Sequence, residues 1–228
     1  VSKPDFATTG FTRATTAGAE FVGVTDLDER IARAGALAAQ HPGSFTYLYV
    51  PELDGIGHRF GWESGAWTDG LERVDASLRD LLRAAPEAGL LITADHGMID
   101  VPASRHVLLD DGDPRLEGVA DIAGEPRMLH LYTHPQAADA VAGVWRASDA
   151  DRAWVMTRDE AIAAGVFGTV NPGIADRIGD VLVAARAQVA YYDNRLDDLS
   201  PQRMVGQHGS LTLEESIVPL IRAGAYAG

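Results

Sequence analysis

Apolar and polar positions along the chain predict strands and helices in alternation. Two short runs, Phe45–Val50 and Leu90–Thr93, are apolar and contain aromatic or β-branched residues, as expected of strands buried in a sheet. Between them, apolar residues recur at helical spacing, at Trp67, Leu71, Val74, Leu78 and Leu81. We therefore expect a strand, helix, strand unit with a right-handed crossover, which places both strand ends at one edge of a parallel sheet.

The rest of the chain continues this alternation. A helix is predicted from a cap near Thr25 and Asp28 to Gln40, and a turn-rich region extends from residue 100 to about residue 175. The further predicted elements are a helix at Ala137–Ser148 and a final short strand at Ile217–Arg222. Short apolar runs occur at Met128–Tyr132 and Ala153–Met156, and the chain then returns through Asp180–Ala184 and Val189–Tyr192. The predicted class is α/β.

Composition restricts the classes of protein and partner. A length of 228 residues with 46% hydrophobic residues suffices for one globular domain. The absence of cysteine excludes disulfides and thiolate metal ligands and leaves the compartment undecided, with the cytoplasm slightly favoured. A net charge of -14 argues against a nucleic-acid polymer as partner, since such binding needs Lys and Arg, and we expect no membrane segment.

A carboxylate and a histidine follow each of the first two predicted strands. Asp95 and His96 follow Leu90–Thr93 after a single residue, Ala94, and Asp54 and His58 lie in a predicted glycine-containing loop after Val50. Ligands bind at the carboxyl ends of strands in α/β sheets, and this combination of side chains suits Zn²⁺, Mn²⁺ or Fe. An isolated D-x-x-x-H pattern is more often a loop hydrogen bond, but two such groups together favour a metal site.

A third histidine, His208, lies between two glycines and precedes a predicted capping box formed by Thr212 and Glu215. Taken alone, it would be interpreted as a loop residue before a helix. The other histidines lack neighbouring carboxylates or look like loop residues, and we expect them to lie outside the site: His41, His106, His130 and His134.

The runs YVPELDGIGHRFGWES, ITADHGMID and GQHGS, in this order between residues 47 and 210, resemble the type I phosphodiesterase/nucleotide pyrophosphatase family of the alkaline phosphatase superfamily. The resemblance implies an alkaline-phosphatase-like sandwich over residues 1–228, with a largely parallel sheet, helices on both faces and a small inserted lid at 101–175. It also implies a hydrolase with two divalent metal ions, zinc first and Mn or Fe as alternatives. Asp54, His58 and His208 would bind one ion, and Asp95 and His96 the other.

The chain departs from the family upstream of Asp54. The resemblance calls for a further metal-binding Asp and a Thr or Ser nucleophile at a helix start, and neither is found; Thr8 and Thr9 lack an activating neighbour. We therefore expect the fold to be incomplete at its N-terminal side and to associate with a missing portion that supplies the nucleophile.

The expected reaction is hydrolysis of a small phosphodiester or nucleotide pyrophosphate by two-metal phosphoryl transfer. Two alternatives stay open. The chain could be a metal-binding fragment or pseudoenzyme without turnover, or a hydrolase of phosphate monoesters, phosphonates or sulfate esters.

Overall fold

The computed structural model describes residues 1–227, which form two compact units. Unit 1 comprises Val1–Gly57, Glu63–Ala94 and residues 219–227, and unit 2 comprises His58–Trp62 and Asp95–Val218. Both units contain helices and strands, so the predicted α/β class is confirmed. No helix within these residues has both the length and the apolar character needed to cross a bilayer.

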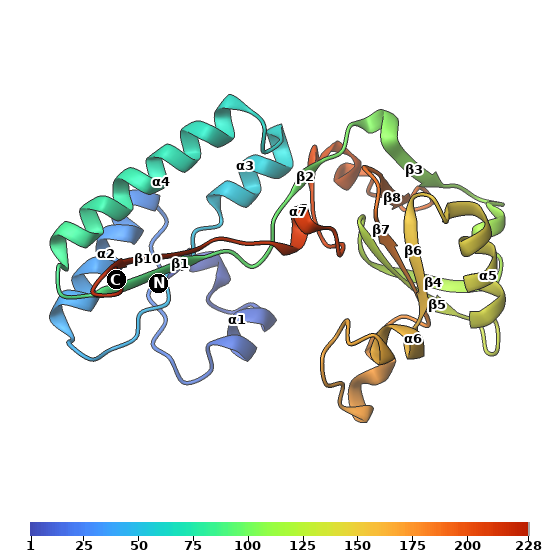
Figure 1. The fold of residues 1–228 in the computed structure, drawn as a ribbon, viewed down its shortest axis with the longest axis horizontal. Helices are drawn as coiled ribbons and strands as arrows, with labels where there is room; N and C mark the ends of the chain where they lie inside the picture. The colour runs from blue at the N-terminus through green and yellow to red at the C-terminus, as the bar shows by residue number, and fades with distance from the viewer. Residues whose placement is uncertain (228) are drawn as a thin grey trace. The chain divides into compact units, whose positions relative to one another are not determined.

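Figure 1 labels most of the regular elements. The α-helices are α1 (Gly10–Thr15), α2 (Leu27–Gln40), α3 (Glu52–Phe60), α4 (Gly65–Ala84), α5 (Ala138–Asp149), α6 (Arg158–Ala163) and α7 (Leu213–Ser216). The strands are β1 (Gly89–Thr93), β2 (Ile99–Asp100), β3 (His106–Leu109), β4 (Val119–Glu125), β5 (Met128–Thr133), β6 (Ala153–Thr157), β7 (Val181–Ala185), β8 (Ala190–Asp193), β9 (Gly206–Gln207) and β10 (Leu220–Gly224).

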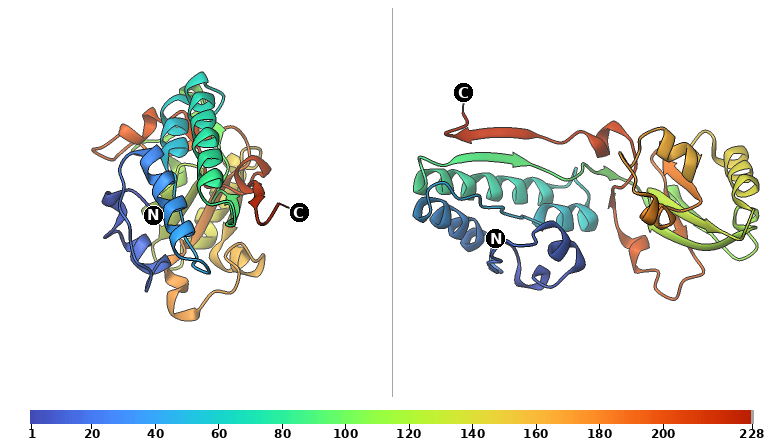
Figure 2. Two further views of the ribbon diagram at one scale, coloured as in Figure 1. Left: turned by 90° about the vertical axis from the view of Figure 1, so that its left-hand side faces the viewer. Right: turned by 90° about the horizontal axis from the view of Figure 1, so that it is seen from below.

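In unit 1, helices α2 and α4 pack together on one side of the ribbon formed by β1 and β10 (Figure 2). Ile31 of α2 and Leu81 of α4 are buried in this cluster, and Leu90 of β1 packs against it. Helix α2 begins one residue later than its expected capping region suggests, because the Asp26 side chain accepts hydrogen bonds from the main-chain N–H groups of Asp28 and Glu29. The helical periodicity of the sequence therefore located this core correctly.

The segment at residues 45–50 is extended but is not a strand of any sheet. Its main chain pairs with the first residue of the chain, since the Val1 amino group donates to the Tyr47 carbonyl at 2.7 Å and the Tyr49 N–H donates to the Val1 carbonyl at 3.0 Å. The Phe45 side chain is 91% exposed. The prediction of a buried strand here is wrong, and so is the parallel crossover to β1, because β1 pairs antiparallel with β10.

The strand pairings are mostly antiparallel. Within residues 1–227 the ladders β1–β10, β2–β9, β4–β5, β5–β7 and β6–β7 are antiparallel, and only β3–β8 is a parallel ladder. The expectation of a largely parallel sheet is therefore wrong for these ladders. His106, expected in a loop, is the first residue of β3.

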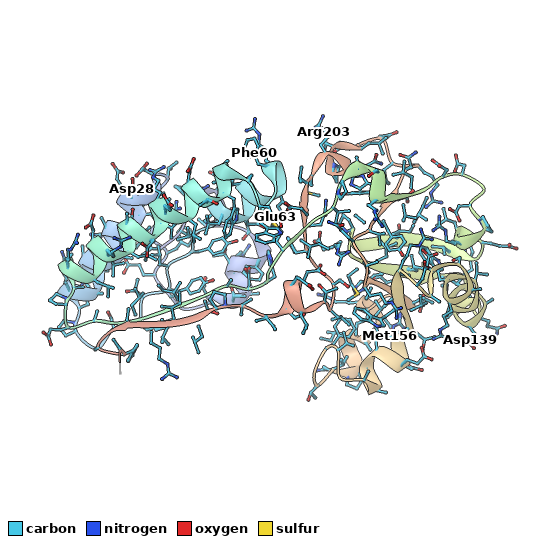
Figure 3. All side chains as sticks on the ribbon, turned by 45° about the horizontal axis from the view of Figure 1, so that its top comes forward. Asp28, Phe60, Glu63, Asp139, Met156 and Arg203 are labelled. Atoms are coloured by element: carbon cyan, nitrogen blue, oxygen red, sulfur yellow. The ribbon has the colours of Figure 1, made fainter. Side chains whose placement is uncertain are left out.

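In unit 2, a four-stranded sheet of order β4-β5-β7-β6 carries the main core, with a helix on each face. Strand β7 is buried along its whole length, and its side chains alternate between the two faces, as the period of a strand requires. Val181 and Val183 pack with Trp145 of α5, whereas Leu182 packs with Ala161 of α6. Asp139 at the start of α5 and Met156 of β6 are labelled in Figure 3. Whether residues 101–175 serve as a lid stays a prediction.

One short ladder, one main-chain hydrogen bond and one tight contact connect the segment that follows His96 with the segments on either side of His208. In the β2–β9 ladder, Ile99 pairs with Gln207 and Asp100 with Gly206. Gly97 donates its N–H to the Glu215 carbonyl at 2.8 Å. A Cβ atom at position 97 would lie only 1.9 Å from the Glu214 carbonyl oxygen. Only glycine fits between these two segments.

We predict that Gly97→Ala destabilises the protein by about 1 to 3 kcal/mol, because the new methyl group forces the main chain of Gly97 away from Glu214. The matched control is Gly143→Ala in helix α5 of the same unit, where nothing lies within 4 Å of the added carbon. That control should stabilise by about 0.5 to 1 kcal/mol, as expected for a helical glycine. Urea unfolding measures both changes, and equal effects would contradict the packing described.

We also predict that stability falls as the pH drops below about 6.5, the ordinary pKa of histidine. Burial lowers the pKa of His106, a shift that a main-chain hydrogen bond with Val101 partly opposes, and burial also lowers the pKa of His130. Below the ordinary value the unfolded chain therefore binds more protons at these positions than the folded chain, which favours unfolding. Urea unfolding at pH 7.5 and 5.5 should show a smaller loss in the variant His106→Gln/His130→Gln than in the wild type. An identical loss in both proteins would refute this assignment.

Candidate metal site

Helix α3 carries Asp54 and His58 one turn apart. Residues four apart lie on the same face of a helix, so the two side chains converge without a loop. The helix places acidic residues in its first turn, with Asp54 among them, and His58 in its last turn, as the helix dipole favours. The predicted loop around Gly55 and Gly57 is therefore wrong, although the predicted convergence of the carboxylate and the imidazole holds. Phe60, at the end of α3, is half exposed (Figure 3).

His58 is fixed by two contacts with the segment that precedes His208. Its carbonyl accepts a hydrogen bond from the Val205 N–H at 2.7 Å, and its Nδ1 lies 2.8 Å from the Gly206 carbonyl oxygen. A carbonyl oxygen can only accept, so Nδ1 carries the proton in this contact. Nε2 then offers its lone pair, which is the form of imidazole that binds a metal ion.

The loop of His208 is held by its neighbours. Gln207 is 1% exposed and its side-chain amide donates to the Tyr192 hydroxyl at 2.7 Å, while burial raises the pKa of Tyr192 to about 12. Gly209 adopts a φ of 118°, in the region that favours glycine. These contacts direct the chain sharply on either side of the imidazole.

One potential ligand atom each of Asp54, His58 and His208 lies within 4.8 Å of the other two, and all three residues are partly buried. Bonds of about 2.0 to 2.2 Å place two ligands of one zinc ion at most about 4.4 Å apart, so small side-chain adjustments suffice for these atoms to share an ion. The donor set of one carboxylate and two imidazoles fits a divalent cation. Among the His, Cys, Asp and Glu side chains of residues 1–227, these three form the group of at least three that could hold a metal ion.

His96 joins this group through its ring. The His96 and His208 rings are stacked, with centroids 3.6 Å apart and planes inclined by 14°. The Nδ1 of His96 lies 2.9 Å from the Gly97 carbonyl oxygen, so by the same reasoning its Nε2 offers the lone pair. Asp95 Oδ1 is 3.7 Å from this Nε2, and the Asp95 side chain is 70% exposed. The Asp95 carboxylate thus lies near the His96 imidazole, and it is the more exposed of the two side chains.

The threonine-rich N-terminal segment contains a helix start that the sequence analysis missed. Thr9 caps helix α1; its hydroxyl accepts from the Thr12 N–H at 3.2 Å and lies 3.2 Å from the Phe6 carbonyl oxygen. A nucleophile needs a neighbouring base or cation to activate it, and these contacts provide neither. The structure therefore gives no reason to assign Thr9 as the nucleophile.

The capping box predicted for Thr212 and Glu215 does not form. The Thr212 side chain makes no capping hydrogen bond to helix α7, and its hydroxyl instead donates to the Glu215 carboxylate at 2.6 Å. Glu215 is buried and pairs with Arg127, a residue that no motif of the sequence had indicated.

Solved structures with a similar fold include two mammalian proteins and a bacterial one. Murine ectonucleotide pyrophosphatase/phosphodiesterase 5 matches 90% of this chain and 54% of its own, with a TM-score of 0.69 and 19% identity. Its human counterpart matches 91% and 54%, with a TM-score of 0.69 and 17% identity. Phosphonoacetate hydrolase from Sinorhizobium meliloti 1021 in complex with phosphonoacetate matches 86% and 49%, with a TM-score of 0.63 and 19% identity. These matches confirm the alkaline-phosphatase-like fold.

The chain thus spans about half the length of the structures it resembles. No curated protein matches it significantly. The family model for type I phosphodiesterase/nucleotide pyrophosphatase, in contrast, matches residues 2–211, which is nearly the whole chain. This chain therefore belongs to the type I phosphodiesterase/nucleotide pyrophosphatase family.

Proposed function

We propose that this chain is the metal-binding part of a hydrolase that acts on small phosphodiesters or nucleotide pyrophosphates. The observation that carries the proposal is the convergence of Asp54, His58 and His208 within 4.8 Å. Membership of the family supports the reaction class. A nucleotide as substrate is supported by the similar structure of an inactive variant of the murine protein, which is in complex with AMP (TM-score 0.67, 19% identity).

In this proposal Asp54, His58 and His208 hold one divalent ion, and Asp95 and His96 hold a second. Zinc is the first choice, because a set of nitrogen and oxygen donors without thiolate suits it, and Mn or Fe are the alternatives. Two bound ions would supply Lewis acidity to the oxygens of a phosphoryl group.

Main-chain carbonyls of the chain orient the imidazole rings of the proposed ligands. The Gly206 and Gly97 carbonyls accept from Nδ1 of His58 and His96, so that Nε2 of each neutral ring is the atom that would bind an ion. The Asp54 and Asp95 carboxylates would balance part of the positive charge of bound ions, and the remaining positive charge would attract a phosphate ester.

The nucleophilic hydroxyl is proposed to come from a portion of the enzyme that is not part of this chain. Thr9 is engaged in capping α1, and no other hydroxyl is assigned this role. The chain alone would then bind metal without turnover and would associate with the portion that supplies the nucleophile. A metal-binding fragment or pseudoenzyme is the alternative if no such portion exists.

A phosphonate is the second candidate substrate. It is favoured by the similarity to the phosphonoacetate hydrolase, whose structures contain phosphonoacetate or phosphonoformate. Phosphate monoesters and sulfate esters would present the same tetrahedral oxyanion to the ions. The metal site alone does not discriminate between these substrates, so a comparison of their rates is needed.

The ligand assignment predicts which histidines control metal binding. His58→Ala and His96→Ala should each weaken zinc binding by at least about 10-fold, because each removes a donor atom. The matched control is His134→Ala, an exposed histidine of unit 2 outside the candidate site. Calorimetric titration with Zn²⁺ and Mn²⁺, together with the metal content after dialysis, measures the effect. Equal losses in all three variants would refute the assignment.

The origin of the nucleophile is tested by turnover. Hydrolysis of bis-p-nitrophenyl phosphate, p-nitrophenyl phosphate and phosphonoacetate is measured with the chain alone and with the upstream coding sequence restored. We expect metal without turnover in the first protein, and in the second a rate on the diester at least about 10-fold above that on the monoester. Turnover by the chain alone, undiminished in Thr9→Ala, would show that the nucleophile is another residue of this chain.

A further inference from the structure

A buried ion pair in unit 2 joins Arg127 to Glu215. The Arg127 Nη2 lies 2.6 Å from Glu215 Oε2 and its Nε lies 3.1 Å from Oε1, so the contact is bidentate. The two side chains are 0% and 1% exposed. A buried pair of this kind is costly to desolvate, and it contributes little net stability by itself. Its placement therefore calls for another explanation.

Arg127 is anchored to the main chain around the four-stranded sheet. Its Nη1 donates to the carbonyls of Ala187 and Val189 at 2.6 Å each, beyond the end of β7, and its Nη2 reaches the Ala185 carbonyl at 3.4 Å. All of these acceptors belong to residues 185–189, which connect two buried strands. The guanidinium group therefore has a fixed position relative to the sheet.

The carboxylate of Glu215, held by Arg127, binds the loop that carries His208. Its Oε1 accepts from the Ser210 N–H at 3.0 Å, and its Oε2 accepts from the Thr212 hydroxyl at 2.6 Å. Ser210 lies two residues after His208 and is itself buried. Both carboxylate oxygens are thus shared between Arg127 and the His208 loop.

The main chain of Glu215 holds the second loop. Its carbonyl accepts from the Gly97 N–H at 2.8 Å, and Gly97 directly follows His96. The contact is too close for any residue larger than glycine at position 97. One residue therefore contacts both loops whose imidazoles stack at 3.6 Å.

We propose that Glu215 is a positioning residue, fixed by Arg127, that sets the relative placement of His96 and His208 and so controls the metal affinity of the site. The inference rests on the proposed function, since it assumes that these imidazoles are ligands. Glu215 is not among the proposed ligands. Its carboxylate fixes one loop, its carbonyl fixes the other, and the ion pair fixes Glu215.

The test compares Glu215→Gln with Asp149→Asn. Asp149 is an equally buried carboxylate of unit 2, paired with Arg152 at 2.9 Å and bonded to the Tyr191 hydroxyl at 3.0 Å, and it lies outside the two loops. Both variants should lower the melting temperature. Only Glu215→Gln should weaken Co²⁺ binding, by about 10-fold or more, and alter the visible absorption of the bound Co²⁺. Equal Co²⁺ affinities and spectra in the two variants would overturn the proposal.

Thr212→Val is the milder variant, for the case in which Glu215→Gln fails to fold. It removes only the hydroxyl that donates to Glu215, because the Thr212 side chain makes no helix cap. Co²⁺ affinity should fall severalfold, and an affinity equal to that of the wild type would overturn the proposal.

Measurements on the metal-free protein distinguish the positioning role of Glu215 from the proposed metal-binding function. In Thr212→Val and Glu215→Gln, but not in Asp149→Asn, the amide protons of Gly97 and Ser210 should exchange faster and the ¹⁵N signals of the His208 ring should shift. If the wild type binds no Co²⁺ but these changes occur, the proposed function fails and the positioning role stands. If Co²⁺ binds but the exchange rates and ring signals stay unchanged, the positioning role fails and the proposed function stands.

Discussion

The buried ion pair of Arg127 and Glu215 is the contact through which the sheet of unit 2 holds the loops of His96 and His208. Two charges removed from water must satisfy each other and all their remaining donors and acceptors, which allows very few arrangements. Arg127 meets this demand with carbonyls at the end of β7, and Glu215 meets it with Ser210 and Thr212. Because the desolvation cost is offset only when all these hydrogen bonds form, the ion pair restricts the positions of the residues that bind it. A hydrophobic pair of equal volume could fill the space without specifying where the loops lie.

Local patterns predicted helices α2, α4 and α5 well, because a helix satisfies its own main-chain hydrogen bonds. The apolar spacing of Val74 and Leu81 sufficed to identify α4, and the run around Leu90 identified β1. The partner of a strand, in contrast, is not encoded in the strand. The run at residues 45–50 has the composition of a strand but lies beside Val1, and β1 pairs with β10 at the far end of the chain. Both errors concerned which segments meet, a property that depends on the whole fold.

The sequence analysis identified the residues of the candidate site better than it predicted the secondary structure and contacts that position them. Asp54 and His58 could be selected because a carboxylate and an imidazole among glycines are recognisable in sequence, whereas His208 was added by the family resemblance. One potential ligand atom of each of the three lies within 4.8 Å of the other two. The helix that carries Asp54 and His58 was mistaken for a loop because of its glycines. Glu215 was interpreted as a cap because a T-x-x-E pattern predicts one, but the buried guanidinium of Arg127 binds the carboxylate more strongly than a main-chain N–H does. Tertiary contacts of this kind override local preference.

The arrangement of hydrogen bonds also explains how a chain of net charge -14 could attract a phosphate ester. The carbonyls of Gly206 and Gly97 accept from Nδ1 of His58 and His96 and so define the tautomer in which Nε2 carries the lone pair. An imidazole in this form contributes a donor atom without contributing charge. Only Asp54 and Asp95 among the proposed ligands are anionic. Two divalent ions would therefore leave an excess of positive charge at the site, and a field of this kind acts at short range, where the distant surface carboxylates are screened. The acidic surface and a site for anionic substrates are thus compatible, provided that the ligands are mainly histidine.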